Sequence, residues 1–136
     1  MSGMFSALRI AASGMTAERL RMNVTAANLA NADSTRSANG QPYRRQEVVL
    51  QQAGSSFSDV LNGVEVAGIV NDPSPGRRVY DPGHPDADAQ GYVTLPNVNS
   101  VTEMTDLITE SRAYQANTQA MQTAKTLYTK TLEVLR

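Results

Sequence analysis

The architecture of this chain follows from its last stretch, residues 100–136, which reads SVTEMTDLITESRAYQANTQAMQTAKTLYTKTLEVLR. The stretch contains no proline or glycine, and its apolar residues recur in steps of three and four, which predicts one uninterrupted helix. At about 1.5 Å per residue, such a helix is roughly 50 Å long. A periodic run beyond about 25 residues favours a coiled coil. The apolar line that we expect to form a subunit-packing seam comprises Met104, Leu107, Tyr114, Met121, Tyr128, Leu132 and Leu135.

The start of this helix carries a capping signal. Ser100 and Glu103 have the S-x-x-E spacing of a capping box, so we expect Ser100 to be the N-cap residue. The polar face farther along is rich in Thr, Gln and Asn instead of the charge pairs usual on a solvated helix. This composition favours dense packing among neighbouring helices, and an ordinary polar surface is the alternative.

Residues 2–31 contain no proline and predict a second helix. One line of residues recurs in alternating steps of four and three over about four heptads, as in a coiled coil. Because the line contains few large residues, it would bind another helix only weakly by itself. Packing on its own domain and packing on a partner helix are both compatible with it, and the two predicted helices together would make an antiparallel pair. The apolar members for which we predict subunit packing are Phe5, Leu8, Met15, Met22 and Leu29.

The middle of the chain, residues 32–97, has a different composition. It holds all six prolines and the only histidine. Residues 63–70 alternate between apolar and polar side chains, residues 43–50 do so in part, and residues 78–80 and 92–95 suit two further short strands. Turn-forming residues separate these segments. We therefore predict an α+β protein with three parts, an N-terminal helix (1–31), a small loop-rich β region (32–97) and a long C-terminal helix (98–136).

The composition excludes several classes of function. The 136 residues include 12 basic and 13 acidic side chains, so a net charge of −1 gives no attraction to nucleic acid or to an anionic membrane. No cysteine is present, which excludes disulfide scaffolds, zinc–thiolate sites and thiol nucleophiles. Leu, Ile, Val and Phe make up roughly a fifth of the chain, a low share for a domain that folds alone. The apolar residues therefore form a modest core or are meant for a partner.

The sequence contains no membrane-spanning or secretory pattern. No apolar stretch approaches the ~20 residues that span a bilayer, so we expect no membrane insertion. The first 15 residues lack a basic n-region, and Arg9 interrupts their apolar part. We expect this segment to be a retained helix and not a cleaved signal peptide.

One small constellation is chemically suggestive. His84 lies among Asp81, Asp86 and Asp88, and such a set could bind a divalent metal or form an acid–base pair, which would make the chain a small metal-dependent enzyme. We favour the alternative of a solvated turn, in which prolines fix the backbone and aspartates cap it. No phosphate-binding glycine loop is present. We therefore expect no catalytic residue, no cofactor and no metal.

Two motifs carry a family resemblance. Residues 26–36, AANLANADSTR, resemble the N-terminal motif of bacterial flagellar rod, hook and hook-associated axial proteins, although Ala27 stands where that family more often has Asn. The block around YDPGHPDA and the short middle region are similar to the proximal-rod members of that family, and the resemblance covers nearly the whole chain. The motif residues are Asn28, Leu29, Ala30, Asn31, Tyr80, Asp81, Pro82, Gly83, His84 and Pro85.

The resemblance implies a structural subunit of the flagellar proximal rod and not an enzyme. Such a chain would be exported unfolded by the flagellar type III apparatus without signal cleavage, and would polymerise into the periplasm-spanning shaft that transmits torque. Its terminal helices would form the inner tubular layer around the export channel. Implied partners are further copies, other rod proteins, the rod–membrane-ring junction protein and, on the outside, the P ring. A soluble helical adaptor or export chaperone, the alternative, would lack these motifs.

Overall fold

The computed structural model describes residues 2–54 and 63–134. Along the chain, one long helix is followed by two short hairpins and then by a second long helix, which confirms the predicted α+β class. The elements are α1 (Ser2–Ala30), β1 (Gln46–Gln52), β2 (Val64–Asn71), β3 (Arg77–Tyr80), β4 (Tyr92–Leu95) and α2 (Ser100–Val134). Within the described residues, no helix combines the length and apolar character that crossing a lipid bilayer requires.

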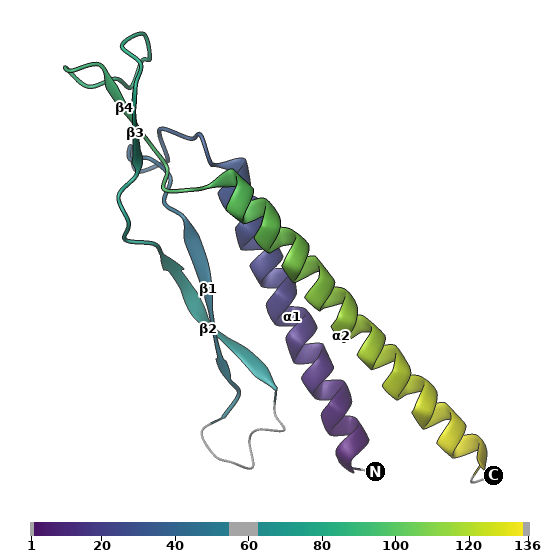
Figure 1. Cartoon of the computed structure of the whole chain (residues 1–136). Coiled ribbons are helices and arrows are strands. Elements are labelled where there is room, and N and C mark those ends of the chain that lie inside the picture. Colours follow the sequence, from purple (N-terminus) through teal and green to yellow (C-terminus); the bar gives the residue numbers. More distant parts are fainter. Residues whose placement is uncertain (1, 55–62, 135–136) are drawn as a thin grey trace.

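The two helices lie side by side and antiparallel, as the sequence predicts, with both ends of the chain at the same end of the pair (Figure 1). Near that end the rings of Phe5 and Tyr128 meet edge to face, with centroids 6.0 Å apart. Midway along the pair, a Cβ placed on Gly14 would lie 2.9 Å from Nδ2 of Asn117. The glycine therefore allows the helices to approach each other closely.

Both sheets are two-stranded antiparallel hairpins. β1 pairs with β2, and Ala67 is the extra residue of a bulge, because Val49 faces Gly68 while Leu50 faces Val66. This hairpin lies along α1 on the side away from α2 (Figure 1), where the Val64 N–H donates to Oγ of Ser13 at 3.1 Å. β3 pairs with β4, and this second hairpin projects beyond the helix end opposite the chain termini (Figure 1).

The core is built from small side chains. Its buried apolar residues are Ala11, Ala17, Val24, Ala32, Val93 and Val98. Buried polar residues lie among them, namely Thr25, Asn28, Glu103 and Glu110. Many of the large apolar residues are exposed instead. The chain therefore has apolar surface even though it contains few large apolar residues.

The predicted capping box is wrong. The Oδ1 atom of Asn99 accepts hydrogen bonds from the backbone N–H groups of Val101 (3.0 Å) and Thr102 (3.3 Å), so Asn99 caps α2 in place of Ser100. Glu103 does not bond back to the cap, because its carboxylate is bound by Arg45 and Asn28. A charge-assisted bond to arginine is stronger than a bond to a backbone amide at a solvated helix end.

Candidate assembly interface

Asn28 holds three elements together at the capped end of the helix pair. Its Nδ2 group donates to the carbonyl oxygen of Gln46 (2.8 Å) and to Oε2 of Glu103 (2.9 Å). Its Oδ1 atom accepts from the Tyr43 hydroxyl (2.9 Å) and from the Gln46 N–H (2.9 Å). These bonds use both donors and both lone pairs of the amide, so the motif position suits asparagine and no other side chain of that size.

The carboxylate of Glu103 is buried but compensated. Nε of Arg45 donates to its Oε1 at 2.6 Å, and the Glu103 side chain is 1% exposed. This hydrogen bond raises the pKa of Arg45. Burial, and then the negative charge of Glu103, raise the pKa of Tyr43 beside it. Each oxygen of the buried carboxylate therefore has a hydrogen-bond partner.

Glu110, one heptad further along α2, is less well compensated. Its residue is 3% exposed, and Oε1 accepts from the Thr25 hydroxyl at 3.1 Å while Nε of Arg21 lies 3.5 Å away. Its Oε2 atom is the one buried side-chain polar atom without a hydrogen-bond partner in the part of the chain that the structure describes. Burial raises the pKa of Glu110 above its usual value.

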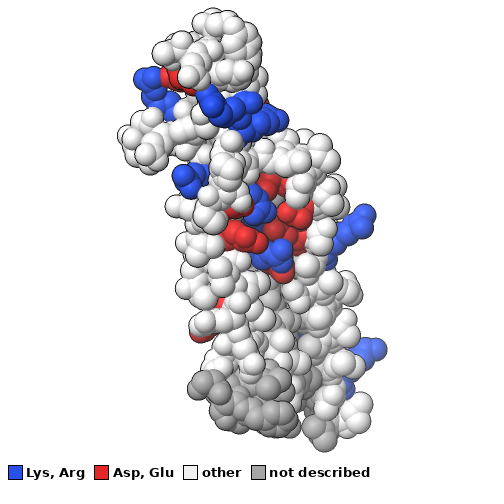
Figure 2. Space-filling model, turned by 60° about the vertical axis from the view of Figure 1, so that its left-hand side comes forward, with Lys and Arg blue, Asp and Glu red and all other residues white. Residues whose placement is uncertain are grey.

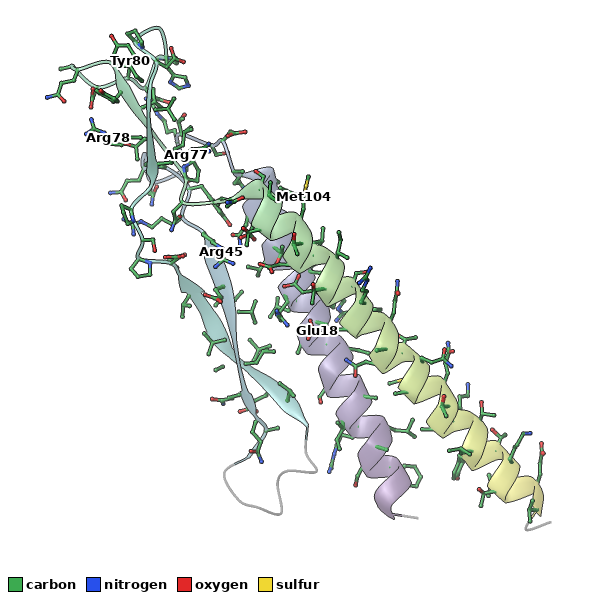
Figure 3. All side chains as sticks on the ribbon, viewed as in Figure 1. Glu18, Arg45, Arg77, Arg78, Tyr80 and Met104 are labelled. Atoms are coloured by element: carbon green, nitrogen blue, oxygen red, sulfur yellow. The ribbon has the colours of Figure 1, made fainter. Side chains whose placement is uncertain are left out.

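A charged pocket opens beside this carboxylate. It has a volume of about 390 Å³ and is lined by residues of α1, β1 and α2 and by Arg45, which precedes β1. The charged residues of the lining are Arg21, Arg45, Glu47, Asp106 and Glu110. Figure 2 shows acidic and basic side chains gathered together at the middle of one face of the molecule, and Figure 3 labels Arg45 between β1 and the helices. No motif in the sequence predicts this cluster. The available signal was the seven-residue spacing of Glu103 and Glu110 on a helix expected to pack.

The YDPGHPDA block forms the loop between β3 and β4. Nδ1 of His84 accepts from the Asp86 N–H at 3.0 Å, and Oδ1 of Asp81 accepts from the Gly83 N–H at 3.2 Å. Asp86 is bound in turn by Thr35 and by Arg36, and the Thr35 hydrogen bond is the main cause of its lowered pKa. His84, Asp81 and Asp88 thus accept hydrogen bonds from backbone groups of their own loop, as in a capped turn, while Asp86 ties the loop to residues 35–36.

The two ends of this loop meet through aromatic rings. Tyr80 and Tyr92 pack edge to face with centroids 5.2 Å apart, and the Arg78 guanidinium lies 4.7 Å above the Tyr92 ring. Pro82 lies close to Gly91 at the base of the loop. Among the described residues, no group of three or more His, Cys, Asp or Glu side chains lies together in a way that could hold a metal ion.

The predicted packing lines lie at the margins of the helix pair. Leu8, Met15, Met22 and Leu29 in α1, and Leu107, Tyr114, Met121 and Tyr128 in α2, are half-buried. Phe5 (58%), Met104 (53%) and Leu132 (45%) are exposed. Leu135 lies outside the described residues. Met15, Tyr114 and Met121 line a common groove of about 210 Å³ between the helices.

The heptad line of α1 lies at the edge of the contact that α1 makes inside the chain, and not at its centre. Ala12 and Ala26, both on that line, are exposed, whereas Ala11, Ala17 and Val24 are buried. The intrachain contact uses the face with the smallest side chains, since these let α2 and the β1–β2 hairpin approach from two sides. The larger side chains of the heptad line are half-buried at the edge of the helix pair, except Phe5, which is exposed.

The face of α2 that points away from α1 is apolar at its start. Val101 (74%), Met104 (53%) and Ile108 (56%) recur at helical spacing and are exposed, and Met104 points outward from the helix in Figure 3. Farther along, threonine hydroxyls donate to the carbonyl four residues earlier, as in Thr123 to Gln119 at 2.9 Å and Thr129 to Lys125 at 2.7 Å. Another helix could therefore cover this surface without leaving these hydroxyls unsatisfied.

Comparisons with known proteins agree with this geometry. A family model described as "Flagella basal body rod protein" matches residues 8–38, and one described as "Flagellar basal body rod FlgEFG protein C-terminal" matches residues 89–134. The chain is 46% identical to the flagellar basal-body rod protein FlgC of Bacillus subtilis, over 96% of this chain and 97% of that protein. The FlgC proteins of Yersinia enterocolitica (49% identity, 90% of this chain, 91% of that protein) and Borreliella burgdorferi (41%, 98% and 99%) are similar along the same regions. The chain belongs to the FlgC family of flagellar basal-body rod proteins.

Membership of the FlgC family makes this chain a structural protein of the basal-body rod and not an enzyme. The two matched regions cover most of α1 and all of β4 and α2, and they include the Asn28 and Glu103 pair that joins the helices. The long helices and the charged pocket between them are therefore the parts of this FlgC-family chain in which assembly contacts are to be sought.

Proposed function

We propose that this chain polymerises with other rod proteins into the proximal part of the flagellar rod, the shaft that carries torque from the membrane ring towards the hook. The observation that carries the proposal is the exposed apolar start of α2, Val101, Met104 and Ile108, on a helix already packed along its other side. A single copy leaves this face in water, whereas a neighbouring helix would bury it. Family membership supports the same role.

In this proposal the helix pair forms the inner layer of a tube around the export channel, and the hairpins lie outside it. The two helices run together along the long axis of the molecule (Figure 1), and side-by-side packing of such pairs resists twisting. The apolar residues along the outside of α1 and α2 are the proposed seam between subunits. The threonine surface of α2 supports close packing, because its hydroxyls are already bonded to carbonyl groups of the same helix.

The chain is proposed to reach the rod through the flagellar type III apparatus, unfolded and without removal of a signal peptide. The absence of cysteine fits this route, because a chain that crosses unfolded into an oxidising compartment then forms no stray disulfides. Proposed neighbours are further copies, other rod proteins and the rod–membrane-ring junction protein. The projecting β3–β4 hairpin is the proposed outer contact towards the P ring.

Electron microscopy of basal bodies from cells that lack this chain tests the proposal. We expect membrane rings without a rod, and rods restored by the wild-type gene. Immunogold labelling of restored basal bodies should place the chain in the rod. A complete rod in the deletion strain would contradict the proposal, and a stable complex of the purified chain with another exported protein would then favour the adaptor or chaperone role.

A further inference from the structure

The charged pocket has more carboxylates than cations. Arg21 binds Glu18 at 3.2 Å, and Arg45 binds Glu103 at 2.6 Å. Three further carboxylates line the pocket and depend on the same two guanidinium groups at longer range: Glu110 at 3.5 Å from Arg21, and Glu47 and Asp106 at 3.7 and 3.8 Å from Arg45. The surplus of negative charge faces an open hollow.

The second observation is the unsatisfied oxygen of Glu110. The residue is 3% exposed, it lines the pocket, and its Oε2 atom has no hydrogen-bond partner among the described residues. A buried carboxylate oxygen without a partner is costly, and it is compensated by a proton, by ordered water or by a group from outside the chain. A cation entering the pocket would lie near Glu110 and near the rim carboxylates Glu47 and Asp106.

The helix pair itself carries a source of such a cation. The charged residues of α2 up to Glu110 are acidic, whereas those beyond it are Arg112, Lys125, Lys130 and one acid, Glu133. Lys125 and Lys130 are the two lysines of the chain, and both are exposed at the end of α2 remote from the pocket. The pair is thus acidic towards one end and basic towards the other, a polarity that suits copies displaced along their long axis. Such head-to-tail contacts use two different patches and can build an open helical assembly.

We propose that the pocket receives the ammonium group of Lys125 or Lys130 from a second copy of this chain in the assembled rod. The inference rests on the proposed function, because it requires neighbouring copies in a polymer. The neighbour's lysine supplies the positive charge that Glu110, Glu47 and Asp106 lack within one subunit. Contact between the two patches also sets the axial offset between copies, since a charged pair this deep tolerates little displacement.

Cross-linking in purified basal bodies tests the partner. Glu47, whose side chain is 63% exposed at the pocket rim, is replaced by cysteine in the cysteine-free chain and treated with a short maleimide–succinimide cross-linker. Within one subunit, Lys125 lies 19 residues beyond Asp106 of the pocket rim, or roughly 28 Å along the helix. A short linker therefore reaches this lysine only in another copy, and Glu65→Cys on the exposed side of β2 serves as the matched control.

We expect mass spectrometry to find Glu47→Cys joined to Lys125 or Lys130 of a second copy, and Glu65→Cys joined to neither. A product with a lysine of a different protein, or a Glu47→Cys thiol left unjoined in rods that contain the chain, would overturn the inference while leaving the proposed function intact. Basal bodies that do not contain the chain at all would instead refute the proposed function.

Removing the charge of Glu110 tests whether this residue acts in assembly or only in the stability of its own subunit. Glu110→Gln keeps the shape and removes the charge, so incorporation into rods should fall about tenfold or more, equivalent to about 1.4 kcal/mol. Glu65→Gln, a matched loss of an exposed carboxylate, should incorporate normally. Unfolding of the purified chain should occur at an unchanged or higher temperature in Glu110→Gln. A lowered unfolding temperature with normal incorporation, or stabilisation of the wild type by added Mg²⁺ or Ca²⁺ that Glu110→Gln abolishes, would overturn the proposal.

Discussion

Asn28 of α1 and Glu103 of α2 meet across the helix pair, with Nδ2 of the amide 2.9 Å from Oε2 of the carboxylate and each residue 1% exposed. This contact joins the N-terminal motif to the start of the last helix, two segments that lie 75 positions apart in the sequence. Because Arg45 binds the other oxygen of Glu103, the pair also fixes the chain just before β1. One amide thus orients both helices and the first hairpin.

Asn28→Ala should therefore lower the free energy of unfolding by roughly 2–4 kcal/mol, since it leaves the buried Glu103, the Tyr43 hydroxyl and the Gln46 backbone groups short of partners. Urea denaturation followed by the far-UV circular dichroism of the helices measures the change. Asn39→Ala is the matched control: Asn39 is exposed and caps its own turn by accepting from the Gln41 N–H, so a loss below about 0.5 kcal/mol is expected. Equal losses in the two variants would show that the Asn28 network contributes nothing to stability.

The fold was predictable because its signals are local. Residues 100–136 predict their helix from periodicity and from the lack of breakers. The turn residues Asn39-Gly40 and Asp81-Pro82 lie in the segment before β1 and in the loop between β3 and β4. The structure agrees at Gly40, whose φ of 77° belongs to a conformation that glycine adopts easily. Elements that depend on neighbours within a few positions were thus predicted with their approximate bounds.

The buried polar network was not predictable in the same way. The same local sequence, residues 100–103, is compatible with a capping box at Ser100 and with a buried ion pair at Glu103. The ion pair forms because Arg45, 58 positions earlier in the chain, lies next to Glu103 in the fold. The α1 contact is another such case. Periodicity identifies the line of larger residues, but close packing uses the line with Gly14, Ala17 and Val24, because small side chains bring two elements nearer. Long-range partners decide both outcomes.

Gly14 and Asn117 allow a test of this close approach. Glycine inside a helix costs about 1 kcal/mol relative to alanine, but a Cβ at this position would lie 2.9 Å from Nδ2 of Asn117. Gly14→Ala alone should therefore change the free energy of unfolding by less than the helix gain. In an Asn117→Ala background the same substitution should give the full gain of about 1 kcal/mol. A double-mutant cycle by urea denaturation measures the coupling, and additive effects would mean that the two residues do not touch.

Alanine substitutions at Gly91 and Gly40 distinguish the cost of backbone strain from the cost of a steric clash. Both have positive φ, 82° and 77°, so alanine at either position carries a conformational cost of roughly 1–2 kcal/mol. A Cβ on Gly91 would also lie 2.9 Å from Cε2 of Tyr80, whereas a Cβ on Gly40 meets nothing within 4 Å. Gly91→Ala should thus destabilise the β3–β4 hairpin more. Near-UV circular dichroism reports the packing of Tyr80 on Tyr92, because the chain has no tryptophan. An unchanged tyrosine signal in Gly91→Ala would contradict the expected clash.

The buried carboxyl of Glu110 predicts a pH dependence with a definite sign. Burial raises its pKa in the folded chain above the usual 4.5, so the folded state binds this proton more tightly than the unfolded state. The contribution of Glu110 to stability is therefore favourable below pH 4.5 and is lost as the pH rises through the folded-state pKa. Thermal unfolding of the wild type and Glu110→Gln at a series of pH values measures it. The wild type should lose stability relative to the variant as the pH rises from 4.5, and parallel curves would refute a raised pKa.

Leu132 tests the proposed seam at the far end of α2. Its residue is 45% exposed, so the subunit itself gains little from this side chain, and Leu132→Asp should leave the helix content of the purified chain unchanged. If a neighbouring subunit buries Leu132, the introduced carboxylate would be placed against apolar surface without a partner, and rod incorporation should fall about tenfold or more. Leu132→Met, which keeps volume and polarity, should incorporate normally. Swimming assays and immunoblots of purified basal bodies measure the outcome, with the exported fraction as a control for secretion. Normal motility of Leu132→Asp would remove Leu132 from the seam. A block of the aspartate variant at export would show instead that the side chain acts before assembly.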